Sequence, residues 1–269
     1  MIVELGLYRR MLGATVRSLM QHRVSFFMQL ISATLITLVE FGALVLVLQR
    51  FDGVGGWSIG EVAMLYGFVA ASFKLLETVG AGFDPHDFGD QVRLGRFDQI
   101  LLRPAGLVTQ VLAGKFDLHR IGQVVEGFVI FGVGVALAGV VWTPEKLAYL
   151  PLVFVGQMAF FAGLYLMGST ITFWTVDAIE AMNVLTYGGQ EMMSYPMHIY
   201  QPWLRRTFTY FIPAIFLNYY PALYLLDRPD PLGMPAWAPF IAPLVGLALL
   251  LVAWRFWRFG LRHYQSTGS

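Results

Sequence analysis

Long apolar runs, separated by shorter stretches that hold most of the polar residues, dominate the chain. A helix that crosses a hydrocarbon core of about 30 Å needs about 20 apolar residues, because it rises about 1.5 Å per residue. Six runs predict membrane-spanning helices at about residues 26–48, 61–82, 121–142, 147–174, 179–196 and 236–257. The fifth run differs from the others because it holds Asn183, Gln190 and Glu191 and is interrupted by Gly188 and Gly189.

The N-terminal segment, residues 1–25, combines apolar and basic residues at helical spacing. Between residues 4 and 23 the arginines lie mostly between the apolar positions, namely Leu5, Tyr8, Leu12, Val16 and Leu19. This pattern predicts an amphipathic helix on the membrane surface, with its basic side chains toward anionic headgroups. A solvated leader to the first span is the alternative interpretation.

Prolines and tyrosines interrupt the apolar segment between the fifth and sixth runs. Within residues 197–235 the prolines include Pro202, Pro213 and Pro221, and several tyrosines are scattered between them. Repeated proline argues against one straight spanning helix, and tyrosine rings favour the headgroup level of a bilayer. We therefore expect a re-entrant pair of short helices that dips into the outer membrane interface.

Composition strengthens the assignment to a membrane. Of the 269 residues, 57% are hydrophobic and only 13% are charged, whereas about a quarter of a soluble domain is charged. The fold class we expect is all-α and membrane-spanning, in a single transmembrane domain over residues 1–269. A net charge of +1 gives no indication of nucleic-acid binding, and the absence of cysteine excludes disulfides and thiolate metal sites. The five histidines are too scattered to predict a metal cluster.

Lys and Arg are unevenly distributed between the two predicted sides of the membrane. They are concentrated before the first run, in the loop at residues 83–120 and at the C-terminus. Since positive residues favour the cytoplasmic side, both termini and this loop are predicted to face the cytoplasm. Arg205 and Arg206, on the predicted outer side, run against the trend.

The loop at residues 83–120 contains signals for short helices joined by a tight turn. Asp84 can cap a helix whose first residue is Pro85, and Gly95 permits a turn. Beyond the turn, Phe97, Ile100 and Leu101 form an apolar face, which we expect to be unable to bury itself within its own loop. Such a knob would suit a groove on a soluble partner; a plain loop lying on the membrane is the alternative.

Two segments of this chain resemble a known family. The run GRFDQILLRP at 95–104 is similar to the cytoplasmic loop of ABC transporter permeases of the type-2 (export) class. The run SYPMHIYQPWLRRTFTYFIPA at 194–214, with NYYPA at 218–222, is similar to the extracellular re-entrant helices of those permeases. Within the class, the chain most resembles a bacterial subfamily of about 260–270 residues, which places it in the cytoplasmic (inner) membrane.

The resemblance implies a coupling helix within residues 84–103 that sits on a separate ATPase subunit. It also implies an assembly of two permeases, identical or related, with two ATPase subunits that bind ATP and Mg²⁺. The residues that this assigns to ATPase coupling are Asp84, Arg93, Arg96, Phe97, Asp98, Ile100, Leu101 and Arg103.

The sequence contains no recognisable nucleotide site or catalytic centre of its own. A P-loop needs G-x-x-x-x-G-K-[ST], and Gly114-Lys115 is followed by Phe116. Neither H-E-x-x-H nor G-x-S-x-G occurs. We therefore expect a permease that is not an enzyme and binds no cofactor itself, with ATP hydrolysis left to the partner.

Charged residues within the predicted spans are costly in a bilayer and require an explanation. They are Glu40, Lys74, Glu77, Glu126 and Glu191. They either line a translocation path or pair with one another and with the backbone across helices. Lys74 and Glu77 are three residues apart on one helix face, a spacing that favours pairing.

Two other classes of protein remain open from the sequence. In an ion-coupled secondary transporter Glu40, Glu77 and Glu191 would be ion sites, although no internal repeat typical of such folds is evident. A membrane enzyme acting on lipid-linked substrates would need a polar cluster at one face, and only residues 198–206 resemble one. Neither the cargo nor the choice between homodimer and heterodimer follows from the sequence.

Small residues recur every four positions in two of the predicted spans. Ala63, Gly67 and Ala71 lie in the second, and Ala159 and Gly163 lie in the fourth. Small residues at this spacing let helix backbones approach closely in lipid, so we assign both sets to helix packing.

Overall fold

The computed structural model describes residues 2–19, 21, 23–50, 53–176 and 180–266. These residues form helices and no β-strand; one isolated antiparallel bridge joins Val54 to Trp57. Five helical segments are long and apolar enough to span a membrane. They are Val24–Ala43 within α2 (Arg23–Arg50), α3 (Ile59–Val79), α7 (Ile121–Ala138), α8 (Pro144–Thr175), and Ala238–His263, which contains α12 (Ala242–His263).

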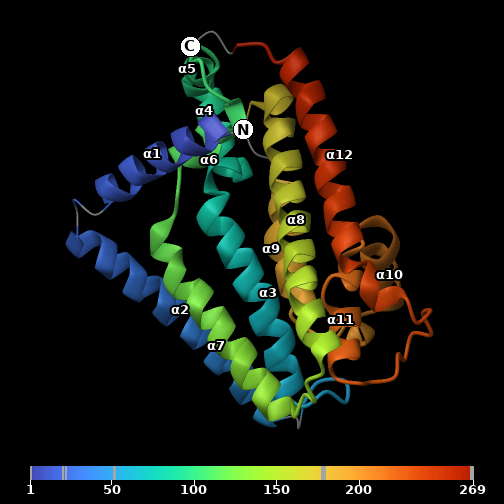
Figure 1. The fold of residues 1–269 in the computed structure, drawn as a ribbon. Helices are drawn as coiled ribbons and strands as arrows, with labels where there is room; N and C mark the ends of the chain where they lie inside the picture. The colour runs from blue at the N-terminus through green and yellow to red at the C-terminus, as the bar shows by residue number, and fades with distance from the viewer. Residues whose placement is uncertain (1, 20, 22, 51–52, 177–179, 267–269) are drawn as a thin grey trace.

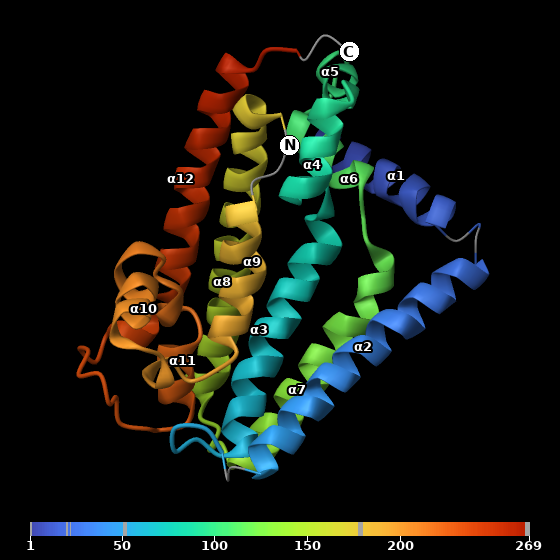
Figure 2. The same cartoon turned by 180° about the vertical axis from the view of Figure 1, so that it is seen from behind.

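The fifth predicted span is the element that differs from this pattern. Its helix, α9 (Glu180–Met193), has 14 residues and so measures about 21 Å, short of a full hydrocarbon core. Residue 179, the first residue of that predicted span, lies outside the described residues. In Figure 2 α9 runs beside α8 and α3, and it leads into the short helices at one end of the bundle. A layout of six full spans therefore stays a prediction.

Helices α3 and α7 pack antiparallel with their backbones in direct contact. A Cβ atom added at Gly67 or at Gly134 would lie within 3.0 Å of the backbone of the other helix. A Cβ at Gly127 would lie 2.6 Å from the amide nitrogen of Ala71. The small residues of the second predicted span therefore serve packing, as their spacing predicts.

Helices α8 and α12 form a second tight pair, which Figure 1 shows side by side. A Cβ at Gly156 would lie 2.7 Å from the carbonyl oxygen of Ala242, and one at Gly163 would lie 3.1 Å from the amide nitrogen of Leu250. Helix α12 continues to His263, beyond the predicted span end at residue 257, because its arginines do not interrupt the helix.

Short helices collect at the two ends of the bundle, as Figures 1 and 2 show. One end carries α1 (Ile2–Leu19), α4 (Pro85–Arg93), α5 (Arg96–Leu101), α6 (Leu107–Gly114) and the C-terminal segment. The other carries α10 (Pro202–Arg206), the π-helical turn Thr207–Phe211 and α11 (Tyr219–Leu225). The prolines between 197 and 235 thus break that segment into short helices.

Helix α1 is separate from the first span and crosses the end of the bundle obliquely (Figure 1). The hydroxyl of Thr15 donates a hydrogen bond to the carbonyl oxygen of Ala113 at 3.0 Å, which fixes α1 to α6. Its Arg9, Arg10 and Arg17 are exposed. This arrangement suits a helix at a membrane surface, although its contact with lipid stays a prediction.

We expect the two glycines of α7 at positions 132 and 134 to respond oppositely to alanine. Gly134→Ala should destabilise the protein by about 1–3 kcal/mol, because its Cβ would be forced against the backbone of Met64. Gly132→Ala, with no atom within 4 Å of the added Cβ, should instead stabilise the helix by about 0.5–1 kcal/mol. Denaturant unfolding in detergent micelles measures both, and equal effects would refute close packing at Gly134.

Candidate functional site

The helical knob, defined here as residues 84–114, protrudes from the bundle end opposite α10 and α11 (Figure 1). Its first helix begins as the sequence predicts. The Asp84 carboxylate accepts hydrogen bonds from the amide groups of His86 at 3.0 Å and Asp87 at 3.4 Å, and Pro85 is the first helical residue. The cap satisfies amide groups that would otherwise have no partner at the helix start.

A glycine turn joins the first two helices of the knob. Gly95 adopts φ 66°, a left-handed conformation that side chains with a Cβ rarely tolerate. The turn redirects the chain so that α5 lies at the end of the knob, in contact with α4. The expected turn between two short helices is therefore present.

The prediction that Phe97 lies on an exposed face with Ile100 and Leu101 is wrong. The Phe97 side chain is 0% exposed, and its ring lies 5.2–5.3 Å from the rings of Phe88 and Phe173. Trp257 and Tyr264 complete an aromatic cluster around it. Phe97 is buried against α8 and α12, which the loop sequence alone does not reveal, whereas Leu101 of the same predicted face stays exposed.

Hydrogen bonds on both sides of the aromatic cluster also hold the knob against the bundle. The hydroxyls of Tyr264 and Ser266 donate to the carboxylate of Asp98 at 2.9 Å and 2.6 Å. Burial and the adjacent Asp98 raise the pKa of Tyr264 to about 12, so its hydroxyl keeps the proton that it donates. The hydroxyl of Ser169 on α8 donates to the carbonyl oxygen of Phe83 at 2.7 Å. The knob is thus fixed to two spanning helices.

An exposed tip remains at the end of the knob. Leu102 is 85% exposed, and Leu94 and Leu101 are each about half exposed. The basic residues beside them, Arg93, Arg96 and Arg103, are also exposed. Apolar side chains surrounded by arginines, on a rigid support, form a surface suited to a protein partner.

A polar groove of about 490 Å³ lies beside this tip, between α4, α5 and α6. Asp87 pairs with Lys115 in it, and the Arg93 side chain donates to Asp90 at 2.6 Å. That hydrogen bond lowers the pKa of Asp90. The side-chain amide of Gln110 donates to the carbonyl oxygens of Ile100 and Ala105, which ties α6 to the end of α5.

A buried ion-pair network surrounds Glu77, near the end of α3 that leads into the knob. Its carboxylate is 2% exposed and lies 2.7 Å from the Lys74 ammonium and 2.6 Å from the Arg120 guanidinium. The Tyr187 hydroxyl on α9 donates to it at 3.1 Å. The structure thus contains the Lys74–Glu77 pair that the spacing predicts, and adds two partners from other helices.

The remaining candidate charges have different surroundings. Glu126 is buried on α7, whereas Glu191 is exposed on α9. The side chain of Glu40 lies outside the described part of the chain. Their assignment to a translocation path stays a prediction.

A polar network in the bundle interior was missed by the sequence analysis. Gln157, 0% exposed on α8, accepts from the Ser72 hydroxyl at 2.6 Å and donates to the carbonyl oxygen of Leu217 at 2.9 Å. Asn218 donates to the carbonyl oxygens of Leu65 and Met193. The one available signal was a lone Gln within a predicted span, since such residues hydrogen-bond across helices.

Comparison with known proteins agrees with this architecture. Residues 34–268 match the family model described as ABC-2 family transporter protein. The chain belongs to that family. Searches of curated proteins and of solved structures give no match. ABC-2 permeases are multi-pass transport components without an ATPase site of their own, and they generally work with ATPase subunits.

Replacing Glu77 with Gln should destabilise the folded protein strongly. We expect a loss of about 3 kcal/mol, at the lower end of the range for removing one partner of a buried ion pair, because Lys74 and Arg120 are partly exposed. Glu145→Gln is the control, since Glu145 is exposed near the start of α8. Thermal unfolding in detergent measures both; equal stability of the two variants would contradict the network's role.

Proposed function

We propose that this ABC-2 permease is half of the translocation pathway of an ATP-driven exporter. A second permease, identical or related, supplies the other half, and two ATPase subunits bind the pair through the tip of the knob. ATP and Mg²⁺ belong to those subunits. The proposal places the knob and both termini in the cytoplasm of a bacterial cell, with α10 and α11 at the outer face of its inner membrane.

The anchoring of the knob supports this function most directly. A partner that moves the exposed tip also moves α8 and α12, because Phe97 and Phe88 are packed against Phe173 and Trp257. The knob also continues directly from α3. A force applied at one surface thus reaches three spanning helices through contacts that leave little freedom.

Charge distribution supports the proposed orientation. The tip, α1 and the exposed end of α12 carry arginines at the same end of the bundle, including Arg17, Arg96 and Arg258. Positive residues favour the cytoplasmic side of a membrane. The soluble ATPase would therefore meet the side of the permease that carries the tip.

ATP can drive transport only if the ATPase binds one permease conformation more tightly than another. The contact between the ATPase and the tip of the knob would provide that difference in affinity. Closure of two ATPase subunits would displace the two tips, and each displacement would tilt α8 and α12 against α3 and α7. A flexible loop would absorb the motion, whereas the anchored knob transmits it.

The two rival functions fit the structure less well. Glu77, a candidate ion site of a secondary transporter, is already neutralised by Lys74 and Arg120. In the segment that suggested an enzyme, both ring nitrogens of His198 are engaged, one with the Tyr219 hydroxyl and one with the carbonyl oxygen of Gly55. A histidine held in this way is poorly placed to act as a general base.

Replacing Leu101 and Leu102 together with Asp should detach the ATPase. Burial of each leucine would contribute roughly 1.5–3 kcal/mol, so losing both should weaken ATPase binding by more than about a hundredfold. The ATPase retained after purification of the permease measures the effect. Tyr210→Asp with Phe211→Asp, at two exposed residues of the opposite end, should retain it. Wild-type ATPase stoichiometry in the leucine variant would refute the proposed docking surface.

Phe97→Ala should separate ATPase binding from transmission. Removing this buried ring should cost about 3–5 kcal/mol of stability, while the leucines and arginines of the tip remain available. We expect the ATPase to bind and hydrolyse ATP without moving the outer end of the permease.

A single cysteine replacing exposed Trp203 on α10 reports that movement, since the chain has no other cysteine. Its labelling rate should change with ATP when Phe97 is present and stay constant in Phe97→Ala. Phe97→Leu, which retains an apolar side chain, is the matched control and should restore part of the response. An unaltered ATP response in Phe97→Ala would contradict transmission through the aromatic cluster.

A further inference from the structure

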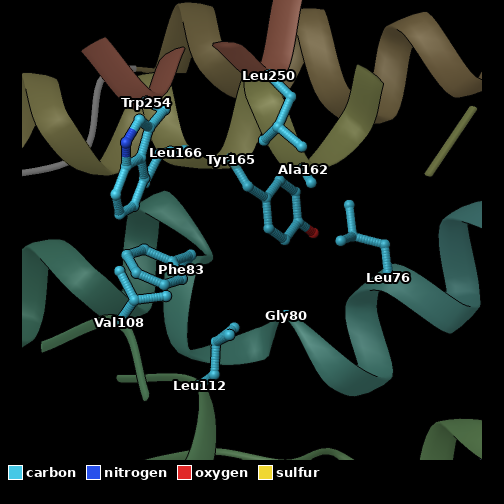
Figure 3. A pocket seen from close by; sticks show the side chains of 10 residues that line it. All are labelled: Leu76, Gly80, Phe83, Val108, Leu112, Ala162, Tyr165, Leu166, Leu250 and Trp254. Atoms are coloured by element: carbon cyan, nitrogen blue, oxygen red, sulfur yellow. The ribbon is translucent and has the colours of Figure 1, made fainter. Parts of the chain in front are cut away.

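An apolar cavity of about 170 Å³ lies between α3, α6, α8 and α12 (Figure 3). None of its lining residues is charged, and apart from Tyr165 and Trp254 their side chains are pure hydrocarbon. Gly80 and Ala162 have no side chain large enough to fill the cavity, so the space between the helices stays open. A space with these walls is unsuitable for water, since buried water needs several polar partners.

The partly exposed lining residues identify the mouth of the cavity. Val108 and Leu112 on one side belong to α6, and Leu250 and Trp254 on the other belong to α12. The latter two lie within a segment that is long and apolar enough to span the membrane. The mouth therefore opens toward the hydrocarbon of the bilayer.

The face of α12 at this mouth changes from apolar to basic over two helical turns. Leu250, Trp254 and Arg258 follow one another at four-residue spacing, so they lie on one face, about 6 Å apart along the axis. Arg258 is exposed and forms no ion pair with a described residue. Hydrocarbon, aromatic ring and cation thus occur in the order in which a phospholipid presents its acyl chain, glycerol backbone and phosphate.

We propose that the cavity takes part of one acyl chain of an anionic phospholipid whose phosphate is bound by Arg258. The acyl chain would make dispersion contacts with lining residues that otherwise face an empty space. Arg258 would gain a negatively charged partner in the phosphate. The occupant is a membrane lipid that enters sideways between α6 and α12. The inference rests on insertion in a bilayer and is independent of the proposed coupling to an ATPase.

Photolabelling tests this site with the full-length protein in vesicles of phosphatidylethanolamine and phosphatidylglycerol. The probe is phosphatidylglycerol with a diazirine in one acyl chain, and mass spectrometry locates the crosslinks. We expect labelling concentrated on peptides that contain Leu112, Leu166 and Leu250. Labelling spread evenly over the lipid-exposed faces of α2, α7 and α12 would overturn the proposal.

Filling the cavity is the decisive variant. Ala162→Phe places a ring in the cavity and should remove most of the labelling there, whereas Ala148→Phe, an exposed position of the same helix, should leave it unchanged. Leu112→Trp fills the cavity from the opposite wall if Ala162→Phe fails to fold. Undiminished labelling of the same peptides in a folded cavity-filling variant would refute the site.

A second variant tests the headgroup. Arg258→Gln should reduce the preference for the phosphatidylglycerol probe over a phosphatidylcholine probe by about fivefold, the usual effect of one basic residue near an anionic surface. Arg262→Gln, one turn further along α12, is the control and should change that preference less. Equal labelling by both probes in the wild-type protein would refute the role of Arg258.

Discussion

Direct contact between helix backbones is the constraint on which the rest of this bundle depends. In a bilayer, spanning helices gain little from hiding apolar surface from one another, so their association relies on close packing. Gly134 brings α7 onto α3, and Gly156 brings α8 onto α12. The bundle therefore consists of two tight pairs, in which a side chain added at either of these glycines would collide with a backbone.

Few contacts join these two pairs, and the strongest are polar or aromatic. Gln157 of α8 is hydrogen-bonded to Ser72 of α3 in the bundle interior, and Asn218 joins the short helices around α11 to the same region. At the opposite end, the knob continues from α3 and packs its aromatic rings on α8 and α12. In the proposed transport mechanism, the angle between the pairs would change while each pair stays intact.

The sequence predicted much of the local structure and less of the contacts between distant segments. Of the six spans predicted from apolar length, five coincide with helices that are long and apolar enough to cross a membrane. The signals at Asp84, Pro85 and Gly95 correctly predicted the start of α4 and the turn after it. Phe97 was misplaced because a short amphipathic helix presents the same pattern whether its apolar face meets a partner or its own chain. Phe173 and Trp257, whose contacts with Phe97 show that this side chain meets its own chain, lie far along the sequence. The 14-residue length of α9 was not predicted, since the apolar run of the sequence extends to residue 196.

The apolar cavity lies between the two helix pairs, so a movement of one pair relative to the other would change its shape. Leu76 belongs to α3, whereas Leu166 and Leu250 belong to α8 and α12, so any change in the angle between the pairs alters the cavity's volume. A ligand shifts a conformational equilibrium only by its difference in affinity for the two states. An acyl chain that fits the cavity would therefore favour the arrangement that keeps it open. The same lipid would oppose a tilt that closes it, so lipid composition and the force on the knob would act on one conformational change.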